Sequence, residues 1–137
     1  MSFRYSQRSL AQLNTCHPDL QLLMLEALSD PECPCDITIV EGHRAEHRQN
    51  QMVEEGKSQL RWPKSKHNSV PSMAVDIVTY RDGTTDWSWD AYDILLPHIR
   101  DTWARLVANE LVTGQYTLEF GADWSFRDGP HVQLNPV

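Results

Sequence analysis

The sequence predicts an α+β fold in which helices pack on one side of a small, mainly antiparallel sheet of about four strands, with a cleft on the other side. Short runs rich in β-branched or alternating apolar residues occur at 36–40, 74–80, 116–120 and 131–134. Apolar residues with helical spacing lie before and between these runs. At 137 residues the chain fits one domain, 1–137, with a single core.

Two helices are expected before the first strand. Ser9 can cap a short first helix, and His17-Pro18-Asp19 begins a second helix with proline near its first turn. Leucines are dense from residue 20 to 28, which predicts that this second helix is buried. Pro31 and Pro34 are expected to end it.

The first strand is predicted at 36–40, where β-branched residues are concentrated. Gly42 lets the chain turn into a polar helix at about 45–55, and Gly56 closes that helix. Basic and polar residues at 57–66 indicate a loop.

The second half of the chain begins with a strand at 74–80 and a hairpin or loop at 81–86. A long helix is predicted next, because apolar residues recur at steps of three and four. They are Tyr92, Leu95, Leu96, Ile99, Trp103, Leu106, Val107 and Leu111. Pro97 is expected to kink or divide this helix, and Gly114 to end it. The strands at 116–120 and 131–134 follow.

The composition narrows the possible functions. A hydrophobic content of 40% and a charged content of 23% are ordinary for a globular protein, so disorder is not expected. A net charge of −7 argues against nucleic acid and against an anionic membrane surface as partners. No segment approaches the roughly 18 apolar residues of a membrane span, and the N-terminus lacks the apolar core of a secretory signal. Cys16, Cys33 and Cys35 are an odd set with poor spacing for a metal or redox pair, so three reduced thiols are expected.

Two histidines and an aspartate stand beside strand-like runs in distant parts of the chain. His67 precedes the strand at 74–80, Asp76 lies inside it, and His131 opens the last strand. Catalytic zinc takes three protein ligands and keeps a fourth position for water, which becomes nucleophilic near neutral pH. A buried carboxylate at Asp76 would be destabilising without a cation. We therefore interpret His67, Asp76 and His131 as ligands of one zinc ion.

Four further residues are candidates for roles around this ion. Asp128, in an Asp-Gly-Pro-His turn, is the candidate general base and acid, although these residues also form simple surface turns. Arg44 could hold a substrate carboxylate or a developing oxyanion, and a solvated helix arginine is the equal alternative. Ser65 is expected to fix its loop or to orient His67. Trp124 either walls the substrate groove or covers the edge of the core.

A rival metal motif occurs at 43–47. His43-Arg44-Ala45-Glu46-His47 matches H-x-x-E-H, in which two histidines on one helix bind zinc and the glutamate is the base. A motif this short arises easily by chance, and no helical glutamate pattern follows to complete it. His43 and His47 are therefore expected to be polar helix residues near the rim of the cleft.

The three parts of the proposed site together resemble a known family. Ser65-x-His67, Ala74-x-Asp76 and Asp128-x-x-His131 are similar to the S-x-H, A-x-D and [DE]-x-x-H motifs of the M15 zinc peptidases. The likeness extends to the run 37–44 with Gly42-x-Arg44, to Phe120-Gly121-Ala122-Asp123-Trp124, and to the opening Met1-Ser2-Phe3. Within the family, the chain most resembles the phage L-alanyl-D-glutamate endopeptidases that serve as endolysins.

One segment departs from the family pattern. Members usually have a shorter link with a glycine between the first histidine and the aspartate, whereas this chain has eight residues, 68–75, and no glycine. We expect the extra residues to bulge out as a loop while Asp76 still enters its strand.

The resemblance implies a fold like that of Hedgehog proteins and DD-peptidases, and a zinc-dependent hydrolase of the peptidoglycan stem peptide that cuts at the L-alanyl-D-glutamate bond. A D,D-carboxypeptidase or D-Ala-D-Ala dipeptidase with the same metal site is an alternative, and so is a non-catalytic, zinc-stabilised module that binds the wall. The resemblance to the phage endopeptidases further implies a monomer that is made in the host bacterial cytoplasm without a signal peptide. Such an enzyme acts on the cell wall after a holin opens the inner membrane.

Overall fold

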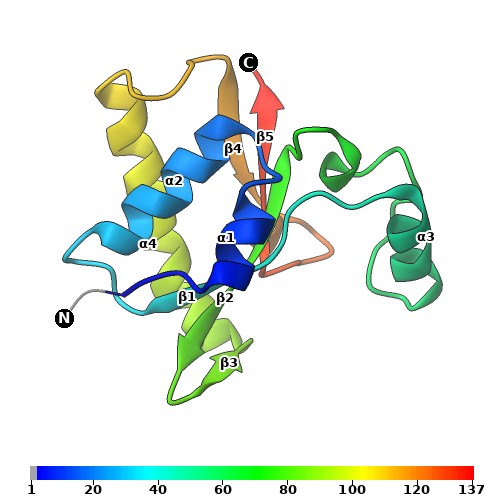
Figure 1. Ribbon diagram of the computed structural model, residues 1–137, viewed down its shortest axis with the longest axis horizontal. Coiled ribbons are helices and arrows are strands. Elements are labelled where there is room, and N and C mark those ends of the chain that lie inside the picture. The colour runs from blue at the N-terminus through cyan, green and yellow to red at the C-terminus, as the bar shows by residue number, and fades with distance from the viewer. Residues whose placement is uncertain (1–2) are drawn as a thin grey trace.

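The computed structural model describes residues 3–137, so Met1 and Ser2 of the opening motif lie outside the described residues. Within that range the chain forms helices, strands and two short 3₁₀ turns, shown in Figure 1. The elements are α1 (Gln7–Leu13), α2 (Pro18–Ser29), β1 (Asp36–Glu41), α3 (Glu46–Glu54), η1 (Lys66–Asn68), β2 (Ala74–Arg81), β3 (Thr84–Asp86), α4 (Trp89–Ala108), β4 (Tyr116–Phe120), η2 (Gly121–Asp123) and β5 (His131–Pro136).

The strands form one sheet in the order β1-β2-β5-β4, and β3 pairs with β2 as a hairpin. Every pairing is antiparallel, so the predicted α+β class with a small antiparallel sheet is confirmed. The β2–β3 turn has positive φ at both Asp82 and Gly83, which is the backbone of a two-residue turn that follows the twist of the strands.

Three helices build the core with the sheet. α1 packs on β1, α4 packs on β2, and α2 packs on α4. Figure 1 shows α3 standing apart from these three helices, on the other side of the sheet's centre. The dense leucines of α2 are buried as predicted, and the largest fully buried side chains include Leu20, Leu23, Tyr92, Leu95, Ile99 and Phe120.

The structure corrects two helix boundaries. Ser6, not Ser9, caps α1, and its side chain accepts the Ser9 N–H at 3.1 Å. Ser9 is itself buried, and its hydroxyl accepts the Ile39 N–H, so it ties the helix to β1. The long helix α4 ends at Ala108, well before Gly114, because Glu110 takes a positive φ of 55° that reverses the chain. Leu111 therefore lies outside the helix and is exposed.

Pro97 does not divide α4, which runs unbroken from Trp89 to Ala108. A proline removes the N–H that would bind the carbonyl four residues earlier, here that of Asp93. Asp93 is exposed, so water can satisfy that carbonyl.

In the part of the chain that the structure describes, no helix combines the length and the apolar character needed to cross a bilayer. All three cysteines are free thiols, as expected.

Candidate metal centre

Strand register brings Asp76 and His131 together. Asp76 of β2 lies directly opposite His131 of β5 in an antiparallel pair, so the two side chains project from the same face of the sheet. On the other side of β2, a bulge between Ile39 and Glu41 places Glu41 opposite Asp76 as well. Segments distant in sequence thus present their polar side chains at one point.

His67 reaches the same point from the turn η1. Ser65 caps that turn: its hydroxyl accepts the His67 N–H at 3.2 Å, while the Ser65 N–H donates to Asn68 Oδ1 at 3.0 Å. The ring is fixed by its Nδ1, which lies 2.7 Å from the Gly42 carbonyl oxygen. This geometry turns Nε2 of His67 toward the sheet.

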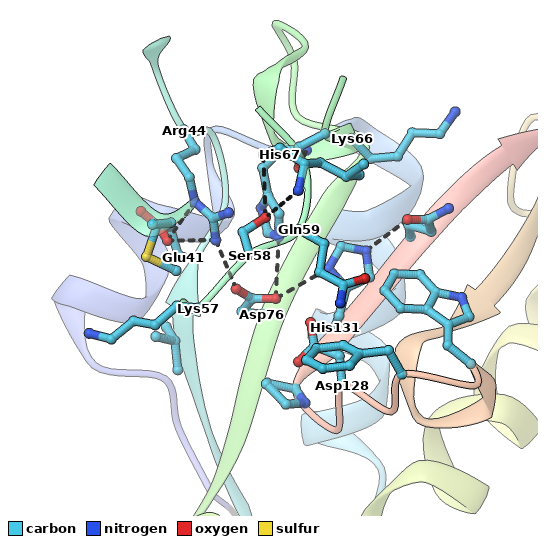
Figure 2. A pocket seen from close by; sticks show the side chains of 18 of the residues that line it. Glu41, Arg44, Lys57, Ser58, Gln59, Lys66, His67, Asp76, Asp128 and His131 are labelled. Atoms are coloured by element: carbon cyan, nitrogen blue, oxygen red, sulfur yellow. Dashed lines mark hydrogen bonds and ion pairs between the residues drawn. The ribbon is translucent and has the colours of Figure 1, made fainter. Parts of the chain in front are cut away.

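The three predicted ligand residues meet at this place (Figure 2). Asp76 Oδ1 lies 3.2 Å from His67 Nε2 and 3.5 Å from His131 Nδ1. One ligand atom from each residue lies within 4.8 Å of the others. The sequence-based expectation that these side chains share one site therefore agrees with the structure, and the group is able to hold a metal ion.

Each imidazole has an outer nitrogen, His67 Nδ1 or His131 Nε2, and an inner nitrogen that faces Asp76. The hydrogen bonds of the outer nitrogens indicate that the inner nitrogens carry lone pairs. Gly42 offers a carbonyl to His67 Nδ1, and Gln133 Oε1 lies 2.7 Å from His131 Nε2. The Gln133 amide is oriented by its NH₂ group, which donates to Glu119 and Asn135. With their outer nitrogens donating, neutral rings direct two lone pairs at the Asp76 carboxylate. A positive charge between them, from a proton or a metal ion, would stabilise that arrangement, and a set of two imidazoles and one carboxylate suits zinc.

The electrostatics of the site point the same way. Burial alone would raise the pKa of Asp76, but His67 and His131 lower it well below its ordinary value. Burial would lower the pKa of His131, but the hydrogen bond and charge of Asp76 raise it by more. Both pKa shifts have the same cause: positive charge is favourable beside the ionised Asp76 carboxylate.

Arg44 is buried and faces Asp76 from the side opposite the imidazoles. Its Nη2 lies 3.2 Å from Asp76 Oδ2 and 2.9 Å from Glu41 Oε1. Its Nε donates to Glu41 at 3.0 Å, and its Nη1 donates to Gln49 Oε1 at 3.0 Å. The guanidinium therefore fixes the outer oxygen of Asp76 and leaves Oδ1 to the imidazoles.

Gln49 is a site residue that the sequence analysis missed. It is fully buried on α3, and its amide oxygen accepts from Arg44 and from Asn68 of the η1 turn. Its NH₂ group donates to Ser58 Oγ and to the Leu60 carbonyl. One side chain thus joins Arg44, the turn that carries His67 and the segment that follows α3. The only signal in the sequence was a glutamine among polar helix residues, which does not distinguish it from its exposed neighbours.

Asp128 lines the same cavity as His67, Asp76 and His131. Its N–H donates to the Gly121 carbonyl at 2.9 Å, and a Cβ on Gly121 would lie only 2.5 Å from the Asp128 carbonyl oxygen. Only glycine allows this close approach. Burial raises the pKa of the Asp128 carboxyl, and the charge of Asp76 raises it further, by more than the nearby cationic groups lower it.

Trp124 packs on His131. Its ring centroid lies 4.8 Å from that of His131, and its Nε1 donates to Glu119 Oε2 at 2.8 Å. Glu119 also accepts from Gln133, which in turn binds His131. Trp124 therefore lines the cavity and supports His131 at the same time.

A cavity of about 680 Å³ opens over these residues. One wall is built from α3 and the segment after it, and the facing wall from the loop between η2 and β5. His67, Asp76 and His131 lie between the two walls (Figure 2). The volume is in the range of small-ligand pockets, so a short peptide segment can enter it.

The rival motif at 43–47 does not form a metal site. α3 begins at Glu46, so His43 lies before the helix and cannot share a helical face with His47. His43 Nδ1 lies 3.0 Å from the Ser69 carbonyl oxygen, and His47 is exposed. The only group of potential metal ligands found among residues 3–137 is that of His67, Asp76 and His131.

The long link between His67 and Asp76 bulges as expected. Val70, at its middle, is 83% exposed. The chain then returns through Ser72, whose N–H donates to the Thr15 carbonyl at 2.8 Å, and enters β2 at Ala74. The extra residues therefore leave Asp76 in its strand.

Comparisons with known proteins agree with this architecture. A family model described as phage L-alanyl-D-glutamate peptidase matches residues 1–134. The L-alanyl-D-glutamate peptidase of Escherichia phage T5 is 33% identical over 149 aligned positions, which cover 98% of this chain and 99% of that protein. The crystal structure of the Serratia marcescens L-Ala D-Glu endopeptidase ChiX is similar with a TM-score of 0.69 and 29% identity, over 96% of this chain and 90% of that one. The chain thus belongs to the family of phage L-alanyl-D-glutamate peptidases.

Proposed function

We propose that this protein is a zinc-dependent endopeptidase that hydrolyses the bond between L-alanine and D-glutamate in the peptidoglycan stem peptide. The observation that carries the proposal is the convergence of His67 Nε2, Asp76 Oδ1 and His131 Nδ1 in a cavity of about 680 Å³. The family supplies the bond: its model and the phage T5 and Serratia relatives are all described by L-alanyl-D-glutamate cleavage.

The three ligand residues would hold the zinc ion, and the groups behind them keep their geometry fixed. Gly42 and Gln133 hold the outer nitrogens of the imidazoles, and Arg44 holds the outer oxygen of Asp76. When bound, zinc supplies Lewis acidity that makes water nucleophilic and polarises a peptide carbonyl. Ser65 contributes by capping the turn of His67, and Trp124 by packing on His131.

Asp128 performs the proton transfers in this proposal. It lines the same cavity as the ligand residues, where its carboxylate can take a proton from the attacking water. It then delivers that proton to the leaving amine of the glutamate residue. A raised pKa suits this double role, because the group must both accept and release a proton near neutral pH.

Arg44 has a positioning role and keeps a free N–H group on Nη1. A guanidinium has five N–H groups, and hydrogen bonds to Glu41, Gln49 and Asp76 engage three of them, one each on Nε, Nη1 and Nη2, while Nη2 also forms an ion pair with Glu41. The second N–H of Nη1 can donate to a substrate carboxylate or to the developing oxyanion, since Arg44 also lines the cavity.

The likeness to a phage protein supports a proposal for the biological setting. The phage T5 relative matches this chain over nearly the whole length of both proteins. We propose that the protein is made in the cytoplasm of an infected bacterium, acts as a monomer, and meets the cell wall after a holin opens the inner membrane.

Product analysis of digested cell-wall sacculi tests the function. The zinc-loaded protein should expose new N-terminal D-glutamate and leave L-alanine as a free C-terminus. Asp128→Asn protein, loaded with zinc in the same way, is the matched control and should release neither. Release of D-alanine instead would identify a D,D-carboxypeptidase. A zinc-bound wild-type protein that binds sacculi without cutting them would be a wall-binding module.

A further inference from the structure

The segment directly after α3 supplies four consecutive residues to the wall of the cavity: Lys57, Ser58, Gln59 and Leu60. Figure 2 shows Lys57 on one side of Asp76 and Asp128 on the other, with Gln59 between them. A substrate bound over the metal ligands must therefore pass between this segment and the wall that carries Asp128.

This segment is held in place on both sides of Gln59. The buried Gln49 amide donates to Ser58 Oγ at 3.0 Å and to the Leu60 carbonyl. Further along, the Trp62 N–H donates to Asn50 Oδ1 at 3.1 Å, a second tie to α3. Because its neighbours are fixed to the helix, Gln59 is presented to the cavity by an ordered backbone, which favours specific recognition.

Lys57 and Gln59 are available to a ligand. The Gln59 side chain points into the cavity, and its amide has no hydrogen-bond partner among residues 3–137. Lys57 has one ion pair, with Glu55 at 3.2 Å, and both of these side chains are exposed. Exposed pairs of this kind contribute little, so Lys57 can exchange Glu55 for a better partner.

The charge of the cavity contrasts with that of the whole chain. The chain carries a net charge of −7. The charged residues that line the cavity are Arg44, Arg48, Lys57, Lys66, Glu41, Asp76 and Asp128, an excess of cations even before a divalent metal binds. Arg44 and Arg48 are paired with carboxylates of the cavity itself, whereas Lys57 is not. A cation-rich cavity in an acidic protein is suited to an anionic substrate.

The proposed substrate is anionic at the right place. A glutamate residue that follows the cut bond is joined through its amine, so it has two carboxyl groups, of which only one can continue the chain. The other carboxylate stays free within a few bonds of the leaving amine. With that amine beside Asp128, the free carboxylate can extend toward the segment 57–60.

We propose, on the basis of the function above, that the segment 57–60 recognises the free carboxylate of the glutamate residue. The Gln59 amide and the Lys57 ammonium donate hydrogen bonds to it. These residues would thereby distinguish a stem peptide with a free glutamate carboxylate from one in which that carboxyl group is amidated.

The test compares two synthetic stem peptides that differ only in a carboxylate or a carboxamide at this position. The wild-type zinc enzyme should cleave the carboxylate peptide with the higher kcat/KM. Gln59→Ala and Lys57→Ala should each reduce that preference about tenfold, as expected for a charge-assisted hydrogen bond, mainly through KM. Gln51→Ala and Lys64→Ala are matched controls, because both residues are exposed and neither lines the cavity. The controls should keep the wild-type preference.

The outcomes separate this inference from the function on which it rests. If a zinc-loaded wild-type protein cleaves neither peptide, the proposed function fails. If it cleaves both peptides equally, or if Gln59→Ala and Lys57→Ala lower both rates by the same factor, the function stands and the recognition role is refuted. Zinc content and circular dichroism of each variant establish that the comparison is between folded, loaded proteins.

Discussion

Replacing Gln49 with alanine should weaken both the fold and the site. Its amide makes contacts with Arg44, Asn68, Ser58 and Leu60, all in a fully buried position. Removal leaves Arg44 Nη1 without this acceptor and the Leu60 carbonyl without this donor. A hydrogen bond to a charged group contributes about 1.5–3 kcal/mol and a neutral one about 0.5–1.5 kcal/mol, so the four contacts, each taken at the low end of its range, give a loss of about 3 kcal/mol.

Urea unfolding of the metal-free protein measures this loss without a contribution from zinc binding. Thermal unfolding should show a midpoint lower by about 10 °C, at roughly 3 °C per kcal/mol for a domain of this size. Gln51→Ala is the matched control, since the same substitution on the same helix at an exposed position removes helix-propensity effects from the comparison. If Gln49→Ala and Gln51→Ala unfold at the same urea concentration, the network around Gln49 does not stabilise the protein as described.

Asp128→Asn should keep bound zinc and lose about 10²–10⁴-fold in turnover, the usual contribution of a general acid and base. Near-normal turnover would assign the proton transfer to another group. Gly121→Ala should lower stability and turnover together, since its new Cβ meets the Asp128 carbonyl oxygen at 2.5 Å; a wild-type unfolding curve would contradict that packing. Arg81 lowers the pKa of Asp86 to about 2, with help from Ser88, so the stabilisation from ionised Asp86 is present above about pH 4 and disappears as the pH falls toward 2. Asp86→Asn should therefore be less stable than wild type at about pH 6 and equal to it near pH 2, and an equal difference at both values would argue against the ion pair.

The elements of the fold were predictable where local chemistry determines them. β-branched runs marked the strands, and the leucines of α2 and the apolar spacing of α4 marked the buried helices. Helix ends were less predictable. Ser6 and Ser9 have the same capping chemistry, and only the packing of α1 on β1 decides that Ser9 is buried against Ile39.

The sequence predicts a set of residues for the site but not their geometry. Family-like motifs identified His67, Asp76 and His131, but their meeting depends on the register between β2 and β5 and on the capped turn at 66–68. A local sequence pattern does not predict the strand register or the place that the turn takes beside the sheet, because register is a property of paired strands. Gln49 shows the limit most clearly: its importance comes from four partners in three separate segments of the chain, which a single sequence cannot reveal.

The most direct test of the central claim is a zinc titration of the chelator-treated protein, with bound metal and peptidoglycan hydrolysis measured in the same samples. The account predicts that hydrolysis is absent without metal, rises in proportion to bound zinc and saturates at one ion per chain. Full hydrolysis by a protein shown to contain no metal would contradict it.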